Sequence, residues 1–133
     1  MDEQTVVASF VIPSKVARYS TFVRGSKTRR KFIEHLYHFS DFDPAVVVRL
    51  PGARETSDDI LHELRSRGAS NSAYVISTNK AFDRKTIPLE QAIRDICALV
   101  EGTIVVCGPK LAYYEGEVPK NRFILHRQGV GVG

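Results

Sequence analysis

The residues best suited to chemistry in this 133-residue chain are cations clustered near its N-terminus. Five of them lie within eight positions: Arg24, Lys27, Arg29, Arg30 and Lys31. Guanidinium and ammonium groups donate charge-assisted hydrogen bonds to phosphate oxygens. Tyr19, Phe22 and Phe32 interleave with these cations, as a surface that stacks nucleic acid bases would require. We therefore expect the five cations to bind an anion, with nucleic acid or another polyanion as the partner.

The charge balance of the chain supports this interpretation. Residues 1–31 contain seven Lys and Arg against two acids, a balance of +5, whereas residues 32–133 contain twelve against thirteen, a balance of −1. The formal net charge of +4 is therefore an N-terminal property. The alternative is that this segment is a solvated loop before a helix that starts nearer Phe32, with the long side chains covering apolar surface.

A second set of chemically capable residues follows three apolar runs that read as strands. In open α/β sheets, ligands bind beyond the carboxyl ends of the parallel strands. If the three runs are parallel neighbours, a rim forms from Arg54, Thr78, Lys80, Cys107 and Lys110. Such a rim suits a phosphate or a carboxylate, and Lys110 would favour the thiolate of Cys107 as a nucleophile. This alternative function is a small enzyme or a ligand sensor, although no known phosphate-loop motif occurs.

No metal or cofactor is expected. His35, His38, Asp41 and Asp43 form a string of ligand types, but histidines near a helix C-terminus are favoured by the helix dipole without any metal. The two cysteines, Cys97 and Cys107, lack the short paired spacing of a zinc site and are expected to be reduced thiols.

The elements that must position these residues are clearest from residue 45 onward. Apolar runs of strand length alternate there with segments of helical period, which is typical of strand–helix alternation with parallel pairing. Strands are predicted over 45–50, 73–77, 103–107, 111–114 and 122–127. A helix is predicted from Thr56 or Ser57 to Arg67, ended by Gly68, and another over 89–100.

The first third of the chain is harder to interpret. Residues 5–12 suggest a strand, and residues 16–23 suggest a second strand or an irregular arm. A helix is predicted over 27–39, with Tyr37 among its inward residues. The predicted fold is a single α/β domain over 1–128, with a mixed sheet of about five or six strands, three helices and a C-terminal antiparallel hairpin, followed by a flexible tail at 129–133.

The remaining expectations concern location and self-association. No apolar run is long enough to span a bilayer, and the start of the chain lacks the basic region of a signal peptide, so a cytoplasmic protein with no membrane partner is expected. A third functional class is a protein-interaction or homo-oligomer module that pairs through an exposed edge strand at 122–127.

Overall fold

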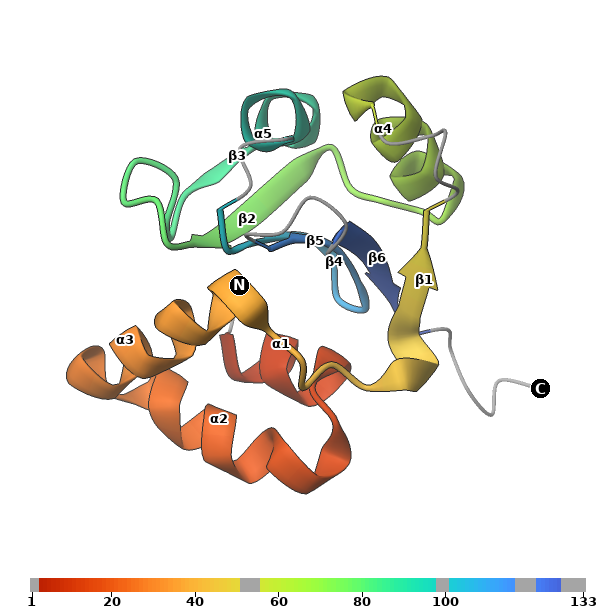
Figure 1. The fold of residues 1–133 in the computed structure, drawn as a ribbon. Coiled ribbons are helices and arrows are strands. Elements are labelled where there is room, and N and C mark those ends of the chain that lie inside the picture. Colours follow the sequence, from red (N-terminus) through yellow and green to blue (C-terminus); the bar gives the residue numbers. More distant parts are fainter. Residues whose placement is uncertain (1–2, 51–55, 98–100, 117–121, 128–133) are drawn as a thin grey trace.

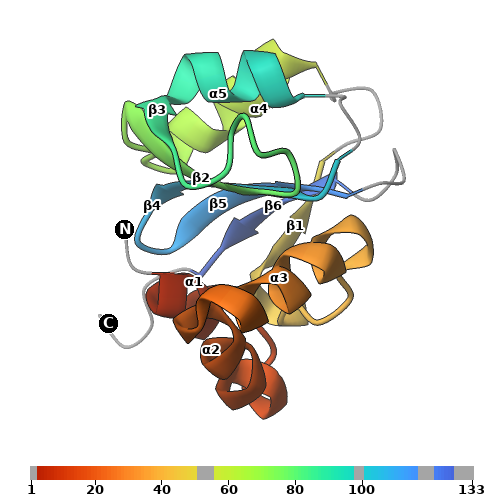
Figure 2. The same cartoon turned by 90° about the vertical axis from the view of Figure 1, so that its left-hand side faces the viewer.

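The computed structural model describes residues 3–50, 56–97, 101–116 and 122–127, which form a six-stranded sheet between two layers of helices (Figure 1). In chain order the elements are α1 (Glu3–Phe10), η1 (Pro13–Lys15), α2 (Val16–Arg24), α3 (Ser26–His35), η2 (Leu36–His38), η3 (Pro44–Val46), β1 (Val47–Arg49), α4 (Ser57–Ser66), β2 (Ser72–Ser77), β3 (Thr86–Pro88), α5 (Leu89–Ile96), β4 (Thr103–Gly108), β5 (Leu111–Glu115) and β6 (Arg122–His126). Helices α1–α3 cover one face and α4 and α5 the other (Figure 2). The predicted α/β class and strand number are confirmed.

The N-terminal third is helical, so the strand predicted over 5–12 is wrong, as are both alternatives for 16–23, a strand or an irregular arm. Residues 3–10 form α1, and Val6, Val7, Phe10 and Val11 are buried. Their spacing of one, four and five residues is that of one helical face. Packing of this face on the sheet outweighs the strand preference of the valines. With α2, the described residues contain five α-helices rather than three.

The local signals placed α4 and α5 correctly. Thr56 caps α4, because its Oγ1 accepts a hydrogen bond from the backbone N–H of Asp59 at 3.2 Å. Gly68 ends the helix with a φ of 93°, and the backbone N–H of Ala69 donates to the carbonyl of Leu64 at 3.1 Å. The helix predicted over 89–100 occurs as α5, and residues 98–100 lie outside the described residues.

The strand order is β1-β6-β5-β4-β2-β3, and every neighbouring pair is antiparallel. The prediction of parallel central neighbours is therefore wrong. Helix α4 does join two strands that run in the same direction, β1 and β2, and α5 does the same for β3 and β4. However, other strands lie between the members of each pair. The short strand β3 was not predicted, and it pairs with β2 on the side opposite to β4.

The C-terminal hairpin is confirmed, but it lies inside the sheet. Strand β6 pairs with β5 on one side and with β1 on the other, in the register Val47↔Leu125 and Arg49↔Phe123. The prediction of an edge strand at 122–127 is wrong, because β1 pairs with the side of β6 that would otherwise be exposed. The edges of the sheet are β1 and β3.

Strand β5 joins the two hydrophobic cores. Tyr113 and Tyr114 point to opposite faces, and both are fully buried because helices cover both faces. The Tyr114 hydroxyl donates to the carbonyl of Leu36 at 2.6 Å and accepts from the backbone N–H of Phe39 at 3.2 Å. These bonds attach η2 to the sheet. Tyr37, predicted to point inward, is 38% exposed.

Candidate functional site

The basic segment forms the corner between α2 and α3. Gly25 has an extended backbone (φ −102°, ψ 139°), and α3 begins at the next residue. The hydroxyl of Thr28 donates to the carbonyl of Phe22 at 2.9 Å and fills the space beside Gly25, where a Cβ would lie 2.5 Å from this oxygen. Residues 26–31 are helical, so the loop before a helix starting nearer Phe32, which the alternative interpretation assumed, is not present.

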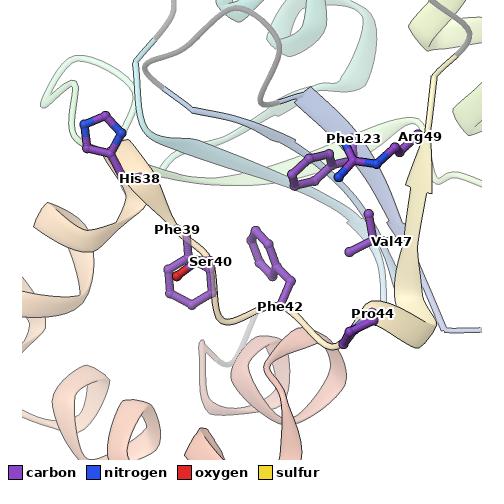
Figure 3. Close-up of a pocket in the computed structure, with 8 residues that line it drawn as sticks. All are labelled: His38, Phe39, Ser40, Phe42, Pro44, Val47, Arg49 and Phe123. Atoms are coloured by element: carbon purple, nitrogen blue, oxygen red, sulfur yellow. The ribbon is translucent and has the colours of Figure 1, made fainter.

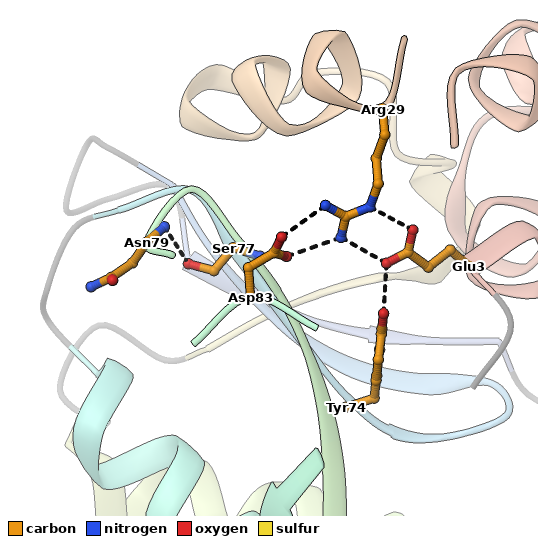
Figure 4. A network of polar contacts seen from close by, with 6 residues as sticks. All are labelled: Glu3, Arg29, Tyr74, Ser77, Asn79 and Asp83. Atoms are coloured by element: carbon orange, nitrogen blue, oxygen red, sulfur yellow. Dashed lines mark hydrogen bonds and ion pairs between the residues drawn. The ribbon is translucent and has the colours of Figure 1, made fainter. Parts of the chain in front are cut away.

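One of the five predicted cations, Arg29, points inward and holds the fold together (Figure 4). Its Nε and Nη2 donate to the two carboxylate oxygens of Glu3 at 2.8 and 2.7 Å. Its Nη1 and Nη2 donate to the carboxylate of Asp83 at 2.7 and 2.9 Å. Tyr74 also donates to Glu3 at 2.8 Å, and the backbone N–H of Ser77 donates to Asp83 at 3.0 Å. Arg29 thus links α1, α3 and the loop between β2 and β3.

In this network the charge of Arg29 is stabilised by the two carboxylates that it binds, Glu3 and Asp83. Burial lowers the pKa of Arg29, but the hydrogen bonds with Glu3 and Asp83 raise it by more, so the net shift is upward. Burial and the hydrogen bond to Glu3 raise the pKa of Tyr74 to about 12. Two N–H edges of the Arg29 guanidinium already donate to carboxylates. Arg29 is therefore not free to bind phosphate, and its assignment to the anion-binding residues is corrected.

The other four cations of the segment point outward. Helical spacing places Lys27 and Lys31 about 160° around α3 from Arg29 and Arg30 about 100° from it, and all three are exposed, as is Arg24. Glu34 is the only acid in residues 16–35. Within the described ranges, no ion pair joins any of these four cations to a carboxylate.

Arg18, which like Arg24 belongs to α2, adds a fifth cation to this surface. Arg18 Cζ lies 5.6 Å from the ring centroid of Phe22, and Lys31 Nζ lies 5.8 Å from the same ring. The sequence analysis did not include Arg18, although its spacing of four from Phe22 was a visible signal. Tyr19 and Phe32 are buried and cannot stack bases. We define the α2–α3 cationic surface as Arg18, Arg24, Lys27, Arg30 and Lys31.

The residues of the predicted strand-end rim are not brought together. Thr78 follows Ser77, which pairs with Thr103 at the start of β4, whereas Cys107 and Lys110 lie at the far end of β4. Four residues of strand separate these ends by roughly 14 Å. Because β2 and β4 are antiparallel, the carboxyl end of β2 lies beside the amino end of β4, and the two carboxyl ends are far apart. Arg54 lies outside the described residues.

Cys107 is a core residue. Its side chain is 1% exposed, and burial raises the pKa of its thiol to about 12. Since the thiolate is the reactive form, this shift makes Cys107 much less reactive than an exposed cysteine at neutral pH. We therefore expect iodoacetamide to modify half-buried Cys97 well before Cys107 in the folded protein, as read by peptide mass spectrometry. Faster alkylation of Cys107 than of Cys97 would contradict this assignment.

The string of histidines and aspartates is divided among other contacts. Asp41 accepts a hydrogen bond from Tyr19 and pairs with Lys15 at 3.5 Å, and Asp43 pairs with Arg127 at 2.8 Å. The hydrogen bond from Arg127 and that from the backbone N–H of Ala45 lower the pKa of Asp43. Among the residues that the structure describes, no group of three or more His, Cys, Asp or Glu is arranged to hold a metal ion.

A pocket of about 630 Å³ lies where the segment after α3 crosses to β1 (Figure 3). Its walls include Phe39, Phe42 and Phe123, and Arg49 lies at its rim. The sequence analysis missed this site, because its walls come from segments about 80 residues apart. The only local signal was Arg49, a cation within an apolar run.

No helix in the described part of the chain is both long enough and apolar enough to cross a bilayer. Comparisons with protein-family models, with curated proteins and with solved structures find no match to this chain.

Proposed function

We propose that this protein is a binding domain for nucleic acid, and that the α2–α3 cationic surface supplies the phosphate contacts. The observation that carries this proposal is the clustering of five exposed cations on α2 and α3 without a carboxylate partner in the part of the chain that the structure describes. Five arginines elsewhere in the fold are paired with carboxylates, namely Arg29 with Glu3 and Asp83, Arg67 with Glu63, Arg94 with Asp58 and Glu90, Arg122 with Glu115, and Arg127 with Asp43, whereas Arg49, Arg65 and Arg84, unpaired within the described ranges, are scattered. The cations of the α2–α3 cationic surface have no such partner among the described residues.

The placement of these cations suits a phosphate backbone. Lys27 lies three residues from Arg30 and four from Lys31, a spacing that brings side chains about 5–6 Å apart on a helix. Lys27 also lies in the first turn of α3, where the helix dipole disfavours a cation by about 0.3–1 kcal/mol. A bound phosphate would offset that cost. Because Tyr19 and Phe32 are buried and Phe22 is only partly exposed beside Arg18 and Lys31, we expect contacts to phosphate and little dependence on base sequence.

The first test is the salt dependence of binding. Fluorescence anisotropy of labelled duplex DNA and single-stranded RNA, titrated with the protein, should show binding at low salt. If all five cations contact phosphates, the slope of log K against log salt should be about −4.5 on duplex DNA and about −3.5 on single strands. Absence of binding at low salt would contradict the proposed function.

The second test asks whether binding depends on the α2–α3 cationic surface or only on the net charge of the protein. The variant R24E/K27E/R30E/K31E should bind at least about tenfold more weakly, since several phosphate contacts are lost. The matched control is R65E/K80E/K85E/K110E, which changes the net charge equally at four exposed cations outside α2 and α3. We expect the control to retain most of the affinity. Equal losses in both variants would contradict the assignment to the α2–α3 cationic surface.

A further inference from the structure

The pocket lies beside β1, at one corner of the sheet (Figure 3). Figure 1 shows β1 on the side of the sheet away from α2 and α3. The segment between η2 and η3 crosses this corner, and it lines the pocket with Phe39, Ser40 and Phe42. The volume of about 630 Å³ lies within the range of about 300–1,000 Å³ that is typical of small-molecule sites.

The walls of the pocket are aromatic and held in place by the core. Phe39 and Phe42 lie 4.5 Å apart between ring centroids, and Phe42 meets Phe123 edge-on at 6.3 Å. Phe42 and Phe123 also contact the buried ring of Tyr114, at 4.9 and 5.4 Å. All these rings are at most 7% exposed, so they form a fixed floor beneath the pocket and present little open ring surface. The site is thus preformed, and a flat ring is a shape that can lie over such a floor.

Arg49 breaks the apolar pattern of β1. Residues 47 and 49 point to the same face of the strand, and Val47 packs against the core there while Arg49 is exposed at the pocket rim. Arg49 lies opposite Phe123 in the register, and its Cζ is 5.3 Å from the ring centroid (Figure 3). This contact holds the guanidinium at the mouth of the pocket. No ion pair to Arg49 occurs within the described ranges.

The charge of the pocket selects an anion. Its polar lining residues are His38, Ser40 and Arg49, and no acidic side chain is among the lining residues that the structure describes. A guanidinium binds carboxylate and phosphate through paired hydrogen bonds. We propose that this pocket binds a small planar aromatic molecule with one anionic group, the ring against Phe39, Phe42 and Phe123 and the anion on Arg49. This inference is independent of the proposed nucleic acid function.

The test uses probes that share one ring. 2-Naphthoate and 2-naphthyl phosphate supply the two sources of anion, and 2-naphthamide is the uncharged analogue of the carboxylate. Binding to the full chain is measured by calorimetry, and the site by changes in backbone amide NMR shifts. We expect both anions to bind more tightly than the amide, with the largest shift changes at residues 39–42, 49 and 123. The tighter of the two anions identifies the preferred group.

Two variants make the outcome decisive. R49Q should weaken both anions at least about tenfold and leave 2-naphthamide unchanged, because only the charge-assisted hydrogen bonds are lost. The control R65Q removes an exposed arginine on α4, in the opposite layer, and should change nothing. S40W should fill the pocket and abolish binding of all three probes, with folding checked by circular dichroism.

Three results would overturn the proposal. The first is equal binding of 2-naphthoate and 2-naphthamide to the unmodified protein. The second is a loss in R65Q as large as that in R49Q. The third is that none of the three probes changes the NMR shifts of the pocket residues.

Discussion

Replacing Arg29 with methionine is expected to lower the free energy of unfolding by about 3–5 kcal/mol, the cost of removing one partner from a buried ion cluster. Methionine keeps much of the apolar stem but removes all four hydrogen bonds to Glu3 and Asp83. The side chains of these acids are only 13% and 19% exposed, so neither is fully solvated once its partner is lost. Urea denaturation followed by circular dichroism measures the loss.

The neighbouring residue provides the matched control for Arg29. Arg30 lies on the same helix but is exposed, and it makes no ion pair with the described residues. The variant R30M should therefore leave stability nearly unchanged. In the triple variant R29M/E3Q/D83N, removal of both acids should recover part of the stability lost in R29M, because no unpaired carboxylate remains. Equal stabilities of R29M and R30M would contradict the structural role of Arg29.

Substituting Gly102 with alanine is expected to destabilise the protein by about 3 kcal/mol, at the upper end of the usual cost of overpacking. A Cβ at this position would lie 2.5 Å from the carbonyl carbon of Leu36 and 2.6 Å from the backbone nitrogen of Tyr37. Neither segment can easily move away. Tyr114 holds η2 through the carbonyl of Leu36, and the Gly102 carbonyl accepts from the backbone N–H of Thr78 at 2.9 Å.

A second glycine of the same strand region tests this explanation. A Cβ on Gly108 would lie 3.4 Å from the Cβ of Leu111, which is an ordinary contact. The variant G108A should thus lose less than about 1 kcal/mol, whereas G102A should show a clearly lower denaturation midpoint. Because η2 leads directly into Phe39, G102A should also weaken probes that bind the aromatic pocket. Equal midpoints for the two variants would show that the close approach at Gly102 is not limiting.

The two candidate sites differ in how far the sequence predicts them. The cationic surface follows from local composition, and four of the five predicted cations do point outward. Arg29 could not be separated from them by sequence, because its partners are 26 and 54 residues away. The aromatic pocket could not be predicted either. It depends on contacts such as that between Phe42 and Phe123, which no short-range pattern records.

The sequence by itself determined the elements whose signals are local. Thr56 and Gly68 mark the ends of α4, and β-branched runs mark β2 and β4, because caps and strand preference depend on a few adjacent residues. Only the tertiary structure decided the helical state of α1 and α2, the antiparallel strand order and the inward orientation of Arg29. Each of these depends on free energy from burial and pairing between distant segments, which exceeds the local preference of the residues involved.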